Sequence, residues 1–98
     1  MPEPGGYVPA VLAAVEAIPP GRVMSYGDVA EYADVPSPRI VGRVLAAEGD
    51  AVPWHRVLRA DGSLAPHIAD EQRQRLLSEG VLFRGARVDL ARFRWDGR

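Results

Sequence analysis

The chain has 98 residues, of which 47% are hydrophobic and 26% charged, and its formal net charge is −1. This length and composition suit a globular protein, and we expect residues 1–98 to form a single domain. The near-neutral charge excludes an unselective binder of polyanions, and the absence of cysteine excludes disulfides, thiolate metal sites and a thiol nucleophile.

The first predicted element is a helix from Tyr7 to Ile18, in "YVPAVLAAVEAI", where the apolar residues recur at helical spacing. Pro9 is tolerated there only in the first turn. The helix ends at "PPG", and "RVMSY" follows as a short extended link.

The second predicted helix runs from Tyr26 to Ala33, with Ser25 as its N-cap and with Val29 and Ala30 facing the core. It is the first member of a closely spaced helical pair, since the next cap signal follows within a few residues.

The third predicted helix lies in "PSPRIVGRVLAAEG", with a cap at Ser37, proline at the first helical position and Gly49 as its stop. Arg39 and Arg43 are four residues apart and therefore project from the same side. Two short helices joined by a tight connector, with arginines on the second, are typical of a helix-turn-helix. An ordinary helical hairpin with a solvated face gives the same pattern.

The second half of the chain predicts a short strand in "VPWHRVL", a turn at "ADGS" in hairpin order, and a helix from Ile68 to Glu79. We expect this helix to bury Leu76 and Leu77 and to end at Gly80. The remaining short extended or irregular pieces are expected to bury the apolar side chains of Val81, Phe83, Val88, Phe93 and Trp95. The fold class is mostly α with short β pieces.

The N-terminal "MPEPGGY" lacks the basic and apolar regions of a secretion signal, and no apolar run approaches the roughly 20 residues of a membrane helix. We therefore expect a cytoplasmic protein with no membrane partner. All twelve positively charged residues are arginine, whose planar guanidinium suits contacts with phosphates and base edges. A codon bias toward arginine explains this composition equally well.

His55 is the residue best suited to acid–base chemistry, and Glu79 could orient its imidazole. The base has no nucleophile to activate, because its neighbour Trp54 carries an indole and no serine lies in a nucleophile-elbow motif. Hydrolysis by His55 and Glu79 acting on water lacks a metal or an oxyanion site. His55 and His67 have no clustered carboxylates at ligand spacing, so we expect no metal and no cofactor.

Four motifs, "RVMSYGDVA", "PSPRIVGRVLA", "VPWHRVLRADGSL" and "RLLSEGV", resemble the DNA-binding domain of the O6-alkylguanine-DNA alkyltransferases over nearly the whole chain. In those enzymes the signature Pro-Cys-His-Arg-Val contains the cysteine that accepts the alkyl group. Trp54 stands in its place here, as in the alkyltransferase-like proteins, which bind alkylated DNA without repairing it. The resemblance implies a winged-helix-like helix-turn-helix domain of the alkyltransferase C-terminal type.

The resemblance also implies a function without catalysis. The protein would dock in the minor groove, flip O6-alkylguanine out of the duplex into a pocket at Trp54, and mark the lesion for nucleotide excision repair. Its implied partners are alkylated double-stranded DNA and the excision-repair proteins, and we expect a monomer.

The family pattern assigns roles to individual residues. Tyr26 would press on the phosphate beside the lesion, Arg39 would enter the base stack as a finger, and Arg43 would add a DNA contact on the same helix. The implied pocket consists of Pro53, Trp54, His55, Val57 and His67, with Arg56 and Glu79 as structural support.

Each main role has a plainer alternative. For Tyr26 the alternative is a half-buried core position, for Arg39 an exposed helix start, and for Trp54 core packing. The start of a helix is unfavourable for a cation, which favours a functional role for Arg39. His67 stands where the best-matching relatives have a lid arginine, which implies weaker or pH-dependent lid contacts. The connector "VPSP" is a residue shorter than the usual form, which affects the approach of Arg39.

Two other functions remain open from the residues. A helix-turn-helix transcription regulator would bind a specific operator as a dimer and would need no role for Trp54. A residual enzyme would use His55 and alter the damaged base.

Overall fold

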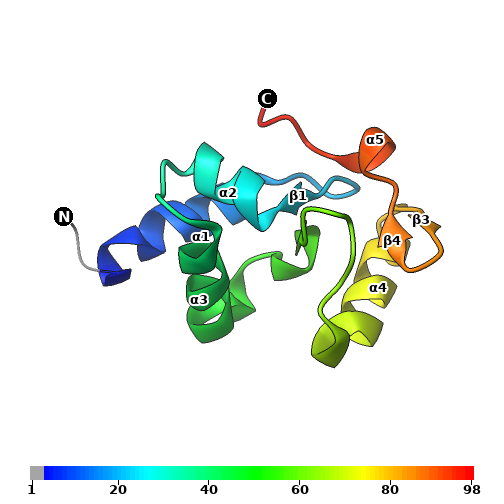
Figure 1. Ribbon diagram of the computed structural model, residues 1–98, viewed down its shortest axis with the longest axis horizontal. Coiled ribbons are helices and arrows are strands. Elements are labelled where there is room, and N and C mark those ends of the chain that lie inside the picture. The colour runs from blue at the N-terminus through cyan, green and yellow to red at the C-terminus, as the bar shows by residue number, and fades with distance from the viewer. Residues whose placement is uncertain (1–3) are drawn as a thin grey trace.

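The computed structural model describes residues 4–98 and confirms the mostly helical class with short strands. Its dimensions are 40 × 28 × 21 Å. The α-helices are α1 (Val8–Ala17), α2 (Tyr26–Tyr32), α3 (Pro38–Glu48), α4 (Ala69–Ser78) and α5 (Leu90–Phe93). The strands are β1 (Met24–Ser25), β2 (Val57–Leu58), β3 (Phe83–Arg84) and β4 (Arg87–Val88). Single 3-10 turns occupy Pro4–Tyr7, Gly49–Ala51, Trp54–Arg56 and Pro66–Ile68. Figure 1 shows α1, α2 and α3 together in one half, with α4 and the β3–β4 hairpin in the other.

The helical pair α2–α3 begins as its capping residues predict. The Ser25 hydroxyl accepts a hydrogen bond from the Asp28 amide at 3.0 Å, and the Asp28 carboxylate accepts one from the Ser25 amide at 3.1 Å. The Ser37 hydroxyl accepts from the Arg39 amide at 3.1 Å, and proline opens α3. Between the helices, Asp34 adopts φ +57°, a left-handed conformation that aspartate tolerates better than most residues. This residue makes the tight turn of the pair.

The hydrophobic core consists of two clusters of buried residues. The first joins α1, α2 and α3 through buried aliphatic residues such as Val15, Val29 and Val41. The second consists of Val23, Leu58, Leu76, Val81 and Val88. Strands β1 and β2 connect them by pairing in parallel, with Met24 opposite Val57 and Ser25 opposite Leu58.

After α5 the chain returns to Val23, the residue that precedes β1. The Val23 amide donates to the Phe93 carbonyl at 2.9 Å, and the Trp95 amide donates to the Val23 carbonyl at 2.8 Å. The C-terminal segment therefore runs back beside β1 and α2, as the red end of the ribbon shows.

Four expectations are corrected. Leu90–Phe93, expected to be irregular or extended, forms α5, with the Phe93 amide donating to the Asp89 carbonyl at 3.0 Å. Of the predicted strand only Val57–Leu58 pairs in a sheet, because the Arg56 amide donates to the Pro53 carbonyl and winds Trp54–Arg56 into a 3-10 turn. The "ADGS" turn forms, with the Arg59 amide bonded to the Ser63 carbonyl, but β2 pairs with β1 rather than with a hairpin partner. Leu77 is 45% exposed, because one residue along a helix turns the side chain away from the face on which Leu76 is buried.

The end of α4 is fixed by the predicted glycine. Gly80 adopts φ +88°, and the Val81 amide donates to the Leu76 carbonyl at 3.0 Å, as in a Schellman motif. Glu79 is the C-cap residue of this helix, so its side chain leaves a backbone that the motif holds in place.

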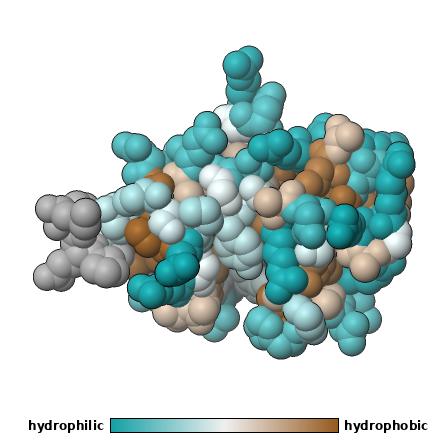
Figure 2. Space-filling model, in the orientation of Figure 1, coloured by the Kyte–Doolittle hydropathy of each residue, from teal (hydrophilic) through white to brown (hydrophobic). Residues whose placement is uncertain are grey.

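Among residues 4–98, no helix combines the length and apolarity needed to cross a membrane. Figure 2 shows hydrophobic residues in small separate patches among hydrophilic ones on the face in view.

Candidate functional site

A pocket of about 640 Å³ lies between α3 and α4, which Figure 1 shows on either side of the segment that connects them. This volume is in the range of small-ligand sites. The pocket is lined by Tyr26, Gly42, Leu45, Ala46, Asp50, Trp54, Ala65, His67, Ile68, Glu71 and Arg75. Residues from the start of α2, the middle of α3, the 3-10 turns and α4 thus meet at one place.

Trp54 supplies the large aromatic surface of this pocket. It is the first residue of a 3-10 turn and is half-buried. Its ring meets the His55 imidazole edge-on, with the ring centres 6.2 Å apart at 90°. The guanidinium carbon of Arg75 lies 5.4 Å from the centre of the indole, within the range of a cation–π contact. An aromatic wall beside a cation suits a flat, polarisable ligand.

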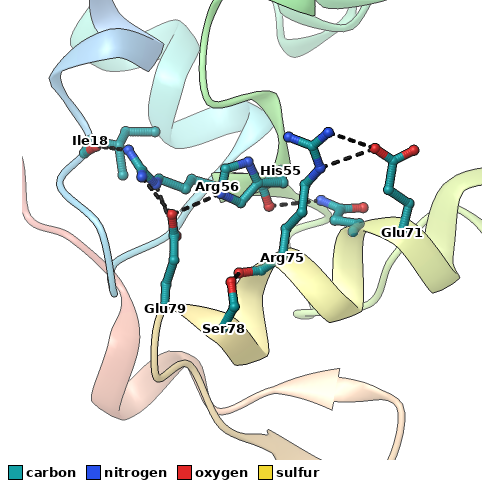
Figure 3. Close-up of polar contacts among 8 residues, drawn as sticks. Ile18, His55, Arg56, Glu71, Arg75, Ser78 and Glu79 are labelled. Carbon is teal, nitrogen blue, oxygen red and sulfur yellow. Dashed lines mark hydrogen bonds and ion pairs between the residues drawn. The ribbon is translucent and has the colours of Figure 1, made fainter.

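Beneath the pocket, Arg56 and His55 share one carboxylate, that of Glu79 (Figure 3). Arg56 donates from Nε to Glu79 Oε1 at 3.0 Å and from Nη2 to Oε2 at 2.6 Å, and its Nη1 donates to the Ile18 carbonyl at 2.9 Å. The His55 Nε2 lies 3.1 Å from Glu79 Oε2. This network ties the end of α1 to the end of α4 and holds the turn that carries Trp54.

The electrostatics of this network favour an ionised carboxylate. Hydrogen bonds from Arg56 lower the pKa of Glu79 from 4.5 to about 2, against the opposing effect of burial. With no thiol in the sequence, His55 and Glu79 have no cysteine to ionise, and their geometry is that of a support.

Gln72 is a buried part of the support that the sequence analysis missed. Its amide nitrogen donates to the His55 carbonyl at 3.1 Å and to the Val57 carbonyl at 2.8 Å. The signal was present, because Gln72 lies four residues before Leu76 and therefore faces the core. The Nδ1 atom of His55 is buried without a hydrogen-bond partner among the residues that the structure describes.

The predicted DNA-contacting residues occupy the start and one face of the helical pair. Tyr26 is half-buried at the start of α2 and lines the pocket; burial raises the pKa of its phenol, and the charge of Arg59 opposes this. Arg39 and Arg43 are exposed on α3, and within the described part of the chain neither has a carboxylate at ion-pair distance.

Arg59 was given no role in the sequence analysis. It is exposed, acts electrostatically on Tyr26 and, in residues 4–98, likewise lacks a carboxylate partner. Other arginines are neutralised within the fold, as Arg94 is by Asp28 through two hydrogen bonds. Unpaired cations remain available for a polyanion.

Some predicted pocket residues lie elsewhere. His67, in the Pro66–Ile68 turn, is exposed and lines the pocket as expected. Val57 is 1% exposed and belongs to the core through the pairing of β2 with β1, so it does not line the pocket. Pro53 and His55 are also outside the lining, where His55 lies buried beneath Trp54. Across residues 4–98, no three histidine or acidic side chains gather as metal ligands would.

Residues 7–81 match the family of the 6-O-methylguanine DNA methyltransferase DNA-binding domain. The chain belongs to this family. It is 48% identical over 88 residues to the "DNA base-flipping protein" of Escherichia coli K12, covering 84% of this chain and 68% of that protein. It is 43% identical over 75 residues to "Alkyltransferase-like protein 1" of Schizosaccharomyces pombe, covering 69% of each.

The fold agrees with this membership. The crystal structure of Schizosaccharomyces pombe Atl1 in complex with damaged DNA containing O6-carboxymethylguanine matches 98% of this chain and 99% of that chain. The TM-score is 0.82 at 29% sequence identity. The chain is therefore an alkyltransferase-like protein, and its relatives include base-flipping proteins, a protein solved in complex with damaged DNA, and methyltransferases.

Proposed function

We propose that this protein binds O6-alkylguanine in duplex DNA, flips the damaged nucleotide into the pocket at Trp54 and holds it there without chemical change. The observation that carries the proposal is the half-buried indole of Trp54 in the wall of a 640 Å³ pocket, in a chain that has no cysteine. An alkylated base offers a π-face and apolar bulk, and an aromatic side chain suits both.

The DNA-binding face is formed by Tyr26, Arg39 and Arg43. We infer that this winged-helix-like domain places α3 in the minor groove of the DNA. Tyr26 then contacts a phosphate, and Arg39 fills the space left in the base stack by the flipped base. The place of Tyr26 in the pocket lining supports its assignment. Arg39 and Arg43 are exposed on α3 and lack acidic partners in the described residues, which supports theirs.

Binding without repair has use only if other proteins act on the lesion. We propose that the bound monomer marks the damage for the nucleotide excision repair proteins in the cytoplasm. The similar structure that was solved in complex with damaged DNA supports a role in handling damage.

The proposal is tested with a duplex that carries one O6-methylguanine. Selective binding with an unaltered base supports it, and equal affinity for an undamaged duplex supports a transcription regulator. Recovery of demethylated guanine supports a residual enzyme using His55.

The finger assignment has its own test. Arg39→Ala should abolish the preference for the damaged duplex while the fold is retained, as checked by circular dichroism. Arg84→Ala, which removes an exposed arginine from β3, is the matched control and should keep the preference. Equal discrimination by Arg39→Ala and the parent protein would refute the assignment.

A further inference from the structure

Arg75 is the single arginine among the side chains that line the pocket, and no motif of the sequence analysis gave it a role. It comes from α4, opposite α3. Its Nε donates to Glu71 Oε2 at 3.0 Å and its Nη2 lies 2.7 Å from the same oxygen (Figure 3). Because its guanidinium also lies 5.4 Å from the centre of the Trp54 ring, a base placed against the indole comes within reach of it.

The contact with Glu71 shows which chemical group Arg75 holds in this place. Glu71 also lines the pocket, so the structure already contains a carboxylate bound to Arg75 at the pocket wall. Guanidinium groups bind carboxylates through paired donors in this way.

The ion pair between Arg75 and Glu71 can exchange one carboxylate for another. The side chains of Arg75 and Glu71 are 50% and 59% exposed and lie one helical turn apart. Ion pairs of this kind contribute little to stability, and a released Glu71 carboxylate would be hydrated. Another carboxylate in the pocket can therefore replace Glu71 at small cost.

We propose that Arg75 selects O6 adducts that end in a carboxylate, such as O6-carboxymethylguanine, by exchanging Glu71 for the carboxylate of the adduct. The inference rests on the proposed function. Besides Arg75 and Glu71, the pocket is lined by the Asp50 carboxylate, which repels such an adduct, and by the His67 imidazole. Arg75 is the only lining residue with a permanent positive charge.

The experiment compares two lesions of the same size in the same duplex. One is O6-carboxymethylguanine, and the other is its neutral amide, O6-carbamoylmethylguanine. The measured quantity is the ratio of the two dissociation constants for each protein variant, so that any general loss of DNA affinity cancels.

Two variants should move this ratio in opposite directions. Arg75→Gln should shift it about tenfold toward the amide, because a charged hydrogen-bond donor is lost. Glu71→Gln should shift it about threefold toward the carboxylate, since the competing carboxylate is removed.

Arg73→Gln is the matched control, because it removes one arginine from the same helix outside the pocket. Arg73 donates to the Gly85 carbonyl at 3.2 Å and lies 4.3 Å from the centre of the Phe83 ring. Its ratio should equal that of the parent protein.

The outcomes separate the two proposals. If the parent binds both lesions selectively but the ratio is the same in Arg75→Gln and Arg73→Gln, the selection by Arg75 is overturned and the proposed function stands. If the parent binds neither lesion better than guanine, both are overturned.

Discussion

Two arginine–glutamate pairs at α4 share the same chemistry and differ in their surroundings (Figure 3). In the Arg56–Glu79 pair the side chains are 13% and 17% exposed, whereas in the Arg75–Glu71 pair they are 50% and 59% exposed. The first pair lies beneath the pocket and the second in its wall. Burial makes the Arg56–Glu79 pair part of the structural support, whereas exposure leaves the Arg75–Glu71 pair accessible to a ligand.

The difference has a structural cause. Arg56 is held by three hydrogen bonds, two to Glu79 and one to the Ile18 carbonyl, so moving it would leave several polar groups unpaired. Within residues 4–98, the Arg75 guanidinium is held only by the Glu71 carboxylate and the ring of Trp54, and water can replace the first of these.

The largest effect is expected for Glu79→Gln, which removes the carboxylate of the buried pair. The substitution leaves the mostly buried Arg56 without its counter-charge, and we expect the free energy of unfolding to fall by about 3 kcal/mol. Urea denaturation of the variant and the parent measures this loss. A loss no larger than that caused by Glu71→Gln would contradict the structural role of the buried pair.

Acid should weaken the buried pair within a defined range. The pKa of Glu79 is about 2 in the folded protein and 4.5 as its ordinary value. Its contribution to stability is therefore complete above about pH 4.5 and is lost as the pH falls toward about 2. The stability difference between the parent and Glu79→Gln, measured in urea from pH 5 to pH 2, should shrink over this range. A difference independent of pH would exclude ionised Glu79 as its source.

Trp54 contacts Arg75 of the exposed pair and His55, which itself bonds to Glu79 of the buried pair. Trp54→Ala should weaken lesion binding by about 1 to 3 kcal/mol, the usual contribution of stacking between a base and an aromatic ring. Fluorescence anisotropy with O6-methylguanine and undamaged duplexes measures the effect. An unchanged preference for the lesion would mean that the indole serves packing alone.

The smallest change in stability is expected for the exposed pair. Glu71→Gln should lower the free energy of unfolding by about 0.3 to 0.5 kcal/mol, as exposed pairs one helical turn apart do. The same urea titration detects it. A loss of several kcal/mol would show that the exposed pair also fastens the fold.

Local signals were enough to predict α1 to α4, but not α5. Ser25, Ser37 and Gly80 fix helix boundaries through hydrogen bonds to residues at most five positions away, so the sequence alone places them. The strand predicted at residues 52–58 was wrong in its first half, because Pro53 and the residues after it wind into a turn that no alternation of side chains reveals.

The site was predicted in part. The resemblance singled out Trp54, Tyr26 and His67, which the fold brings to one pocket. Arg75 opens the motif "RLLSEGV", but neither Arg75 nor Glu71 was given a role, because nothing in "EQRQR" tells which side of α4 faces the indole.

Residue types and near neighbours along the chain were sufficient to assign helices α1 to α4, their caps and the replacement of a reactive cysteine by Trp54. Only the tertiary structure decided that Val57 joins the core, that Gln72 holds the loop from below, and that two similar ion pairs differ in exposure. Burial and contact depend on segments that are far apart along the chain, and their packing alone sets the solvent around each charge.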